Sequence, residues 1–169
     1  EAIGTTEKTG TRVTFQRDAQ IFPSTDFDFD VLSQRLRELS FLNAGLRIKV
    51  SHERNGKNHD FCYEGGIVSF VEHLNRARAP LHRPPILLSG ERSFTSGNKD
   101  VKVGIEIALQ YNESYNESVY AFANNINTVE GGSHLIGFRT ALTRTLNRYL
   151  AQQGKNGKDK DAAEAMSGD

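Results

Sequence analysis

Hydrophobic and polar positions follow a clear helical period near the carboxyl end of this chain. Gly131 and Gly132 come first, and Ser133 stands at the position of a helix N-cap. At about 100° per residue, the apolar side chains that follow fall on one arc. These are Leu135, Phe138, Leu142, Leu146 and Tyr149. The pattern predicts one long helix that is capped by the serine.

Arg139 breaks the pattern of that helix. It lies about 20° from Leu146 and Leu150, inside the apolar arc, whereas Arg144 and Arg148 lie on the opposite, solvated side. A buried guanidinium without a partner is very costly, so Arg139 must meet a carboxylate, backbone carbonyls or a wet cavity. Two interpretations stay open: the side chain snorkels from the margin of the arc, or it points into a channel that holds an anion.

The first half of the chain predicts two helices around a hairpin. Asp28 or Asp30 can cap a helix that runs to about Leu42 and ends at 43–45. Strands at 46–52 and 59–64 flank a turn at 54–57, and Gly65–Gly66 opens a second helix. The expected apolar face of the first helix consists of Val31, Leu32, Leu36, Leu39 and Leu42, and that of the second of Ile67, Phe70, Val71 and Leu74.

Prolines 80, 84 and 85 then interrupt the pattern and mark a candidate domain boundary. A short strand is expected at 86–89, and clean alternation over 101–109 predicts the best strand of the chain. Residues 119–123 are expected to pair with that strand, and 90–99 to form a polar loop. The predicted fold class is therefore α+β.

Both ends of the chain suggest an internal piece of a longer protein. Residues 11–15 alternate as a strand does, and a lone strand needs a sheet to join. Residues 155–169 are charged and small, and we expect a flexible charged segment from 153 onward.

Composition narrows the class of protein. Of 169 residues, 37% are hydrophobic and 25% charged, which is typical of a globular chain with one or two domains. Basic and acidic residues balance at 21 each, so any contact with DNA must be local. The single cysteine, Cys62, fits a reducing cytoplasm, and neither a signal peptide nor an apolar run long enough for a membrane span is found.

The residues themselves predict neither a catalytic nor a metal site. Glycine loops with Walker or Rossmann spacing are absent from the sequence. Strand alternation puts His59 and Cys62 on opposite faces, which disfavours a metal site with His52. Ser133 and His134 are adjacent, which is not the geometry of an activated nucleophile.

Several motifs, in order, resemble the B subunits of DNA gyrase, which are ATP-dependent type II topoisomerases. They cover roughly residues 8–150. The motifs are Thr9–Phe15, Arg35–Asn43, Tyr63–Ile67, Ala108–Asn112, and Asn124–Thr128 followed by Gly131–Gly132, together with the helix that begins at Ser133.

The resemblance implies a domain organisation and explains why the residues show no catalytic site. Residues 1–78 would be the C-terminal part of a GHKL-type ATPase domain. Residues 79–152 would begin an α/β transducer domain, similar to domain 2 of ribosomal protein S5. Catalytic residues of the family would lie outside this chain, with most of the site for ATP and Mg²⁺. Thr11 and Val13 would remain as parts of the nucleotide pocket.

By the same resemblance, Arg139 matches an arginine that faces a DNA-sized cavity between two subunits. The segment would couple ATP binding and hydrolysis to DNA strand passage and negative supercoiling. Its partners would be double-stranded DNA, the gyrase A subunit, and a second gyrase B chain in an A2B2 assembly, in the cytoplasm. Three alternatives stay open: the B subunit of topoisomerase IV, a non-enzymatic nucleic-acid-binding module, and a purely structural α+β interaction domain.

Overall fold

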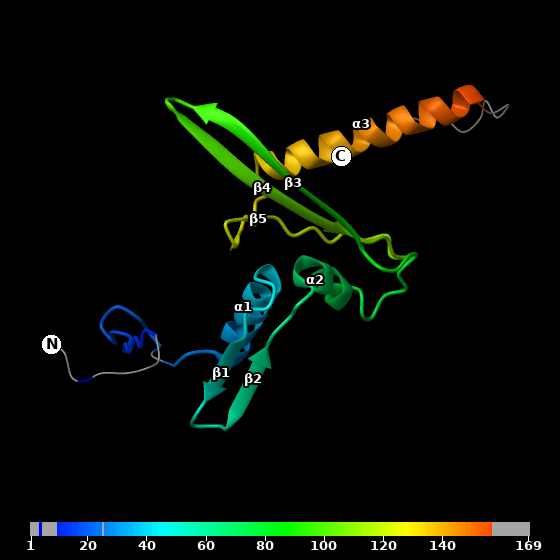
Figure 1. Cartoon of the computed structure of the whole chain (residues 1–169). Helices are drawn as coiled ribbons and strands as arrows, with labels where there is room; N and C mark the ends of the chain where they lie inside the picture. The colour runs from blue at the N-terminus through cyan, green and yellow to red at the C-terminus, as the bar shows by residue number, and fades with distance from the viewer. Residues whose placement is uncertain (1–3, 5–9, 25, 157–169) are drawn as a thin grey trace. The chain divides into compact units, whose positions relative to one another are not determined.

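The computed structural model describes residue 4 and residues 10–24 and 26–156, and it divides the chain into two compact units. These are Glu1–Gly66 and Ile67–Asp169. Figure 1 shows helices and strands mixed along the chain, as the predicted α+β class requires. The elements are α1 (Phe29–Leu42), β1 (Ile48–His52), β2 (Lys57–Phe61), α2 (Gly66–Leu74), β3 (Ile86–Ser96), β4 (Lys99–Leu109), β5 (Phe122–Ala123), β6 (Ile126–Asn127) and α3 (Ser133–Asn156).

Helix α1 begins and ends where its capping residues predict. The Asp28 carboxylate accepts hydrogen bonds from the backbone N–H groups of Asp30 and Val31, which satisfies donors that the first turn leaves open. At the other end Asn43 is the C-cap, and Gly45 has a φ of 78°. That left-handed conformation is one that glycine adopts without a steric penalty. Both ends of this helix are confirmed.

The buried face of α1 differs from the prediction. The buried residues are Phe29, Ser33, Ser40 and Phe41, whereas Val31 is 64% exposed. The β1–β2 hairpin packs on the phenylalanine and serine side, where His59 of β2 contacts Ser33 and the ring of Phe29. Ser40 Oγ donates to the carbonyl of Arg37 at 2.8 Å, which satisfies the buried hydroxyl. Of the predicted face, Val31 and Leu32 are exposed, while Leu36, Leu39 and Leu42 are half-buried, so the prediction was only partly right.

The first hairpin is confirmed. β1 and β2 pair antiparallel from Ile48 with Phe61 to His52 with Lys57, and Gly56 in the turn has a φ of 69°. Behind it the rings of Phe41 and Tyr63 stack at 3.7 Å between centroids. The buried hydrophobic residues of the described chain are four phenylalanines, Phe29, Phe41, Phe61 and Phe70, and three of them lie in this unit.

The strand predicted at 11–15 is not formed. Residues 11–16 have no regular secondary structure, and Val13 and Phe15 are 78% and 71% exposed. A strand is stable only when a neighbour pairs with its backbone donors and acceptors, and the described residues place no such neighbour beside this segment.

The second unit contains one long β-hairpin where a strand and a loop were expected. β3 and β4 pair over eleven positions, from Ile86 with Leu109 to Ser96 with Lys99, and Gly97 turns with a φ of 62°. The expected loop at 90–99 is thus mostly strand. Cross-strand contacts explain this, because Lys102 pairs with Glu91 at 3.3 Å and Thr95 donates to Asp100 at 2.9 Å.

The partner predicted for residues 119–123 is also wrong. β4 pairs with β3, while β5 turns back on β6 through Asn124 and Asn125, whose φ values are 48° and 66°. Two successive positive φ values match a type I′ turn, which asparagine tolerates better than most residues. This local chemistry holds residues 122–127 together as their own hairpin.

Helix α2 shows the expected start and buries Phe70, and α3 runs from Ser133 to Asn156. The carbonyl of Gly132 accepts the first helical hydrogen bond, from Ile136, so Ser133 is the first helical residue rather than the cap. The flexible segment predicted from 153 begins inside α3, and residues 157–169 lie outside the described residues. In the part of the chain that the structure describes, no helix has the length and apolar character needed to span a bilayer.

Candidate nucleic-acid interface

The candidate interface is built on one half-buried stripe of α3. Its apolar members are Leu135, Phe138, Leu142, Leu146 and Leu150. Tyr149, which was expected on the stripe, is 56% exposed. Each step of four residues turns about 40° around a helix, so the stripe drifts toward Leu150 and leaves Tyr149 behind.

Arg139 lies on this stripe, as its helical angle predicts. Its side chain is 36% exposed, and its Nη2 donates to Glu117 Oε2 at 2.8 Å, while the Glu117 side chain is 65% exposed. The partner that the sequence required is thus a carboxylate. Arg144 and Arg148 are exposed on the other side of the helix, as expected.

The Arg139–Glu117 ion pair is accessible to solvent. Pairs of this kind contribute about 0.2–1 kcal/mol because water and salt screen them. An anion that approaches Arg139 therefore meets a weak competitor rather than a sealed contact. This geometry can accept a phosphate, with Glu117 moving aside.

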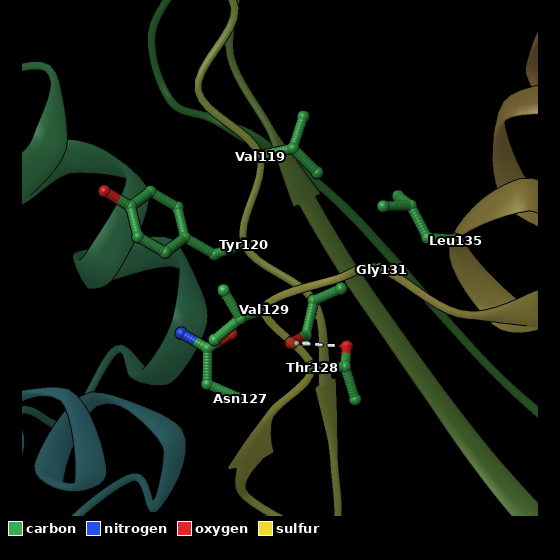
Figure 2. Close-up of a pocket in the computed structure, with 8 residues that line it drawn as sticks. Val119, Tyr120, Asn127, Thr128, Val129, Gly131 and Leu135 are labelled. Atoms are coloured by element: carbon green, nitrogen blue, oxygen red, sulfur yellow. Dashed lines mark hydrogen bonds between the residues drawn. The ribbon is translucent and has the colours of Figure 1, made fainter.

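A small pocket of about 200 Å³ lies at the start of α3. Val119 and Leu135 face each other across it in Figure 2, and Thr128 donates through both its backbone nitrogen and its hydroxyl to the carbonyl of Ala121, at 2.8 and 3.0 Å. The pocket is lined by Val119, Tyr120, Ala121, Asn127, Thr128, Val129, Gly131 and Leu135. None of these eight residues is an acid or a histidine.

A network of amide side chains holds the proline-rich loop at 79–84, and sequence reasoning missed it. Asn75, only 8% exposed, donates through Nδ2 to Gln110 Oε1 at 2.7 Å and accepts from Asn112 Nδ2 at 2.8 Å. Gln110 Nε2 donates in turn to the carbonyl of His82 at 2.8 Å. The Ala108–Asn112 motif is therefore structural at this point. Its signal was a pair of amides directly after the best strand.

His82 completes the network from the loop side. The backbone N–H of Tyr111 donates to His82 Nε2 at 3.1 Å, so Nε2 carries a lone pair there. The proton then sits on Nδ1, which lies 3.1 Å from the carbonyl of Pro84. One imidazole thus joins the strand end to the loop.

Thr11 and Val13 do not line the pocket at the start of α3. Both are exposed, on the irregular segment described above. The described residues around them do not enclose a nucleotide, because both side chains are open to solvent. Their assignment to a nucleotide pocket stays a prediction.

Histidine and cysteine chemistry is equally limited. Among the described residues, no group of three histidine, cysteine or acidic side chains could hold a metal ion. His59 instead contacts the hydroxyl of Ser33 and lies 5.2 Å from the ring of Phe29. His134 Nε2 lies 3.5 Å from the hydroxyl of Thr128, and no acidic side chain among the described residues is shown in contact with it.

Comparison with known proteins gives a consistent result. A family model described as DNA gyrase B matches residues 66–167. The B subunit of DNA gyrase from Myxococcus xanthus is 51% identical over 172 residues, which covers 98% of this chain and 20% of that protein. The corresponding protein of Clostridium acetobutylicum is 46% identical over 173 residues, which covers 99% of this chain and 26% of that protein.

A solved structure supports the fold. The 43K ATPase domain of Thermus thermophilus gyrase B, in complex with an aminocoumarin, is similar with a TM-score of 0.64 and 32% sequence identity. The similarity covers 88% of this chain and 38% of that one. The chain thus spans about a fifth to a quarter of the two sequence relatives, and 38% of the solved chain.

Proposed function

Because this chain belongs to the DNA gyrase B family, we propose that it is the segment of gyrase B that couples ATP binding and hydrolysis to DNA strand passage. The relatives reported above are named as gyrase subunits, which favours gyrase over topoisomerase IV. The whole protein would be an ATP-hydrolysing topoisomerase that introduces negative supercoils. This chain would bring no catalytic residue of its own.

The domain assignment is part of this proposal. Residues 1–78 would complete a GHKL-type ATPase domain, and 79–152 would begin the transducer domain. Thr11 and Val13 would line the nucleotide pocket, and ATP with Mg²⁺ would bind mainly through residues outside this chain. The similarity to a gyrase B ATPase domain supports nucleotide binding in the full protein.

The observation that carries the DNA part of the proposal is the position of Arg139. A guanidinium held on the half-buried stripe of α3 and paired with the accessible Glu117 carboxylate is placed to exchange that carboxylate for a phosphate. Its neighbours on the stripe, Leu135, Phe138 and Leu142, are apolar, so none of them offers it a charged partner. We assign Arg139 to the surface that meets the duplex.

The partners follow from the same family. The full protein would act on double-stranded DNA together with the gyrase A subunit, and two gyrase B chains would associate through their ATPase regions in an A2B2 assembly. Such an assembly would work in the cytoplasm, where the DNA is.

The test compares Arg139→Ala with Arg148→Ala in the full-length protein. Arg148 is exposed on the same helix, so its removal is a matched change of charge. Arg139→Ala should reduce DNA-stimulated ATP hydrolysis and leave hydrolysis without DNA nearly unchanged, while Arg148→Ala should alter neither. If both rates and the melting temperature fall together in Arg139→Ala, the arginine is structural and the proposal fails.

A further inference from the structure

Glu117 lies on a loop that is fastened on both sides. Ahead of it, the backbone N–H of Glu113 donates to the carbonyl of Ala79 at 3.1 Å. Directly after it, Arg78 Nη1 donates to the hydroxyl of Ser118 at 3.3 Å, and residues 119–121 line the pocket with Leu135. These contacts therefore restrict the position of the loop and keep the Glu117 carboxylate close to Arg139.

We propose that Glu117 is an intramolecular competitor for Arg139, which occupies the guanidinium when no duplex is present and gives way to a DNA phosphate. The inference rests on the proposed function of Arg139 as a DNA-facing residue. A carboxylate and a phosphate accept hydrogen bonds from the same guanidinium edge, and the two anions repel when both approach it. Duplex binding at this point is thus an exchange of one anion for another.

The exposure of the pair sets the strength of the competition. The Glu117 side chain is 65% exposed and that of Arg139 36%, so water and salt weaken their attraction and lower the free energy needed to separate them. On the scale of exposed ion pairs, removal of the negative charge should tighten duplex binding about two- to fivefold near 0.1 M salt. The gain should shrink as salt rises.

Glu117→Gln is the informative variant, because it keeps the size of the side chain and an oxygen that can accept from Arg139. Glu113→Gln is its matched control. Glu113 is exposed on the same loop and makes no ion pair with the described residues. Both variants change the net charge by one, but only one of them changes the partner of Arg139.

The experiment measures the affinity of the full-length protein for a fluorescein-labelled linear duplex by fluorescence anisotropy. It compares wild type, Glu117→Gln, Glu113→Gln, Arg139→Ala and the double variant Glu117→Gln/Arg139→Ala. Glu117→Gln should tighten binding about two- to fivefold in the wild-type background and have no effect in the Arg139→Ala background. Glu113→Gln should leave the affinity close to wild type.

Three outcomes would overturn the competitor role. In the first, Glu117→Gln does not tighten binding although Arg139→Ala weakens it. Arg139 would then contact DNA, but Glu117 would not compete for it. In the second, Glu117→Gln tightens binding to the same extent in the Arg139→Ala background, or no more than Glu113→Gln does in the wild-type background. The effect would then be general repulsion between the negative charge and DNA. In the third, Arg139→Ala has no effect on the affinity for the duplex. That result would refute both the proposed contact of Arg139 with DNA and the competition by Glu117.

Discussion

The substitution Asn75→Ala tests the amide network that ties the end of α2 to the loop at 79–82 and to the strand end at 110–112. It removes two hydrogen bonds, of 2.7 and 2.8 Å, from a side chain that is 8% exposed. Each bond contributes about 0.5–1.5 kcal/mol, and the amides of Gln110 and Asn112 lose a partner in a partly dry place. We expect the substitution to lower the free energy needed to open the loop by about 2 kcal/mol.

A loss of that size raises the population of the open loop, and with it the rate of hydrogen exchange, by about 30-fold, at about 1.4 kcal/mol for each factor of ten. Three amides report the opening, because their hydrogens bridge the two segments. The N–H of Leu81 donates to the carbonyl of Tyr111, and the N–H of Tyr111 donates to His82 Nε2. The N–H of Glu113 donates to the carbonyl of Ala79. Hydrogen exchange with mass spectrometry on the full-length protein measures them as two short peptides.

Asn116→Ala is the control for this prediction. Asn116 is exposed on the neighbouring loop, and its removal should change exchange at these amides by less than a factor of about two. Unchanged exchange in Asn75→Ala would refute the reasoning, because the network would then hold nothing. An equal rise over the whole second unit would also refute it, since the effect would be global rather than local.

Three further predictions concern the fold, each read from the free energy of unfolding. Phe41→Ala, at a ring that is 1% exposed, should cost about 3–5 kcal/mol, and a loss below about 1 kcal/mol would mean that the Phe41–Tyr63 stack is not part of the core. Gly97→Ala should cost about 1–2 kcal/mol because Gly97 in the turn has a φ of 62°. Its control, Gly104→Ala, lies in open space on β4 and should be neutral or slightly stabilising. Equal effects of the two substitutions would contradict the turn geometry. Asp28→Ala should cost about 0.5–2 kcal/mol by removing the N-cap of α1, and no loss would show that the two N–H groups find other acceptors.

How far the sequence could predict the fold depended on how local the deciding interactions were. Asp28 capping α1, Gly56 turning the first hairpin and the glycines before α3 act within a few residues, and the structure has all three elements. Arg139 belongs here too, because its place on the stripe follows from helical angle alone. Its carboxylate partner, twenty-two positions earlier in the chain, could not be identified from the sequence.

The errors arose where packing or pairing decided. The side of α1 that meets the hairpin was set by small serines such as Ser33 rather than by the number of leucines. The segment 90–99 has the composition of a polar loop, although cross-strand pairing with β4 makes residues 90–96 a strand. The segment at 11–15 has a strand pattern without a strand beside it among the described residues.

The most direct test of the account is the salt dependence of duplex binding by the full-length protein with and without Arg139. Each phosphate that a cation neutralises adds about 0.9 to the slope of log affinity against log salt concentration. If Arg139 exchanges Glu117 for one phosphate, Arg139→Ala should lower that slope by about one. An identical slope for the wild type and Arg139→Ala would contradict the account, because the half-buried guanidinium of α3 would then take no part in holding DNA.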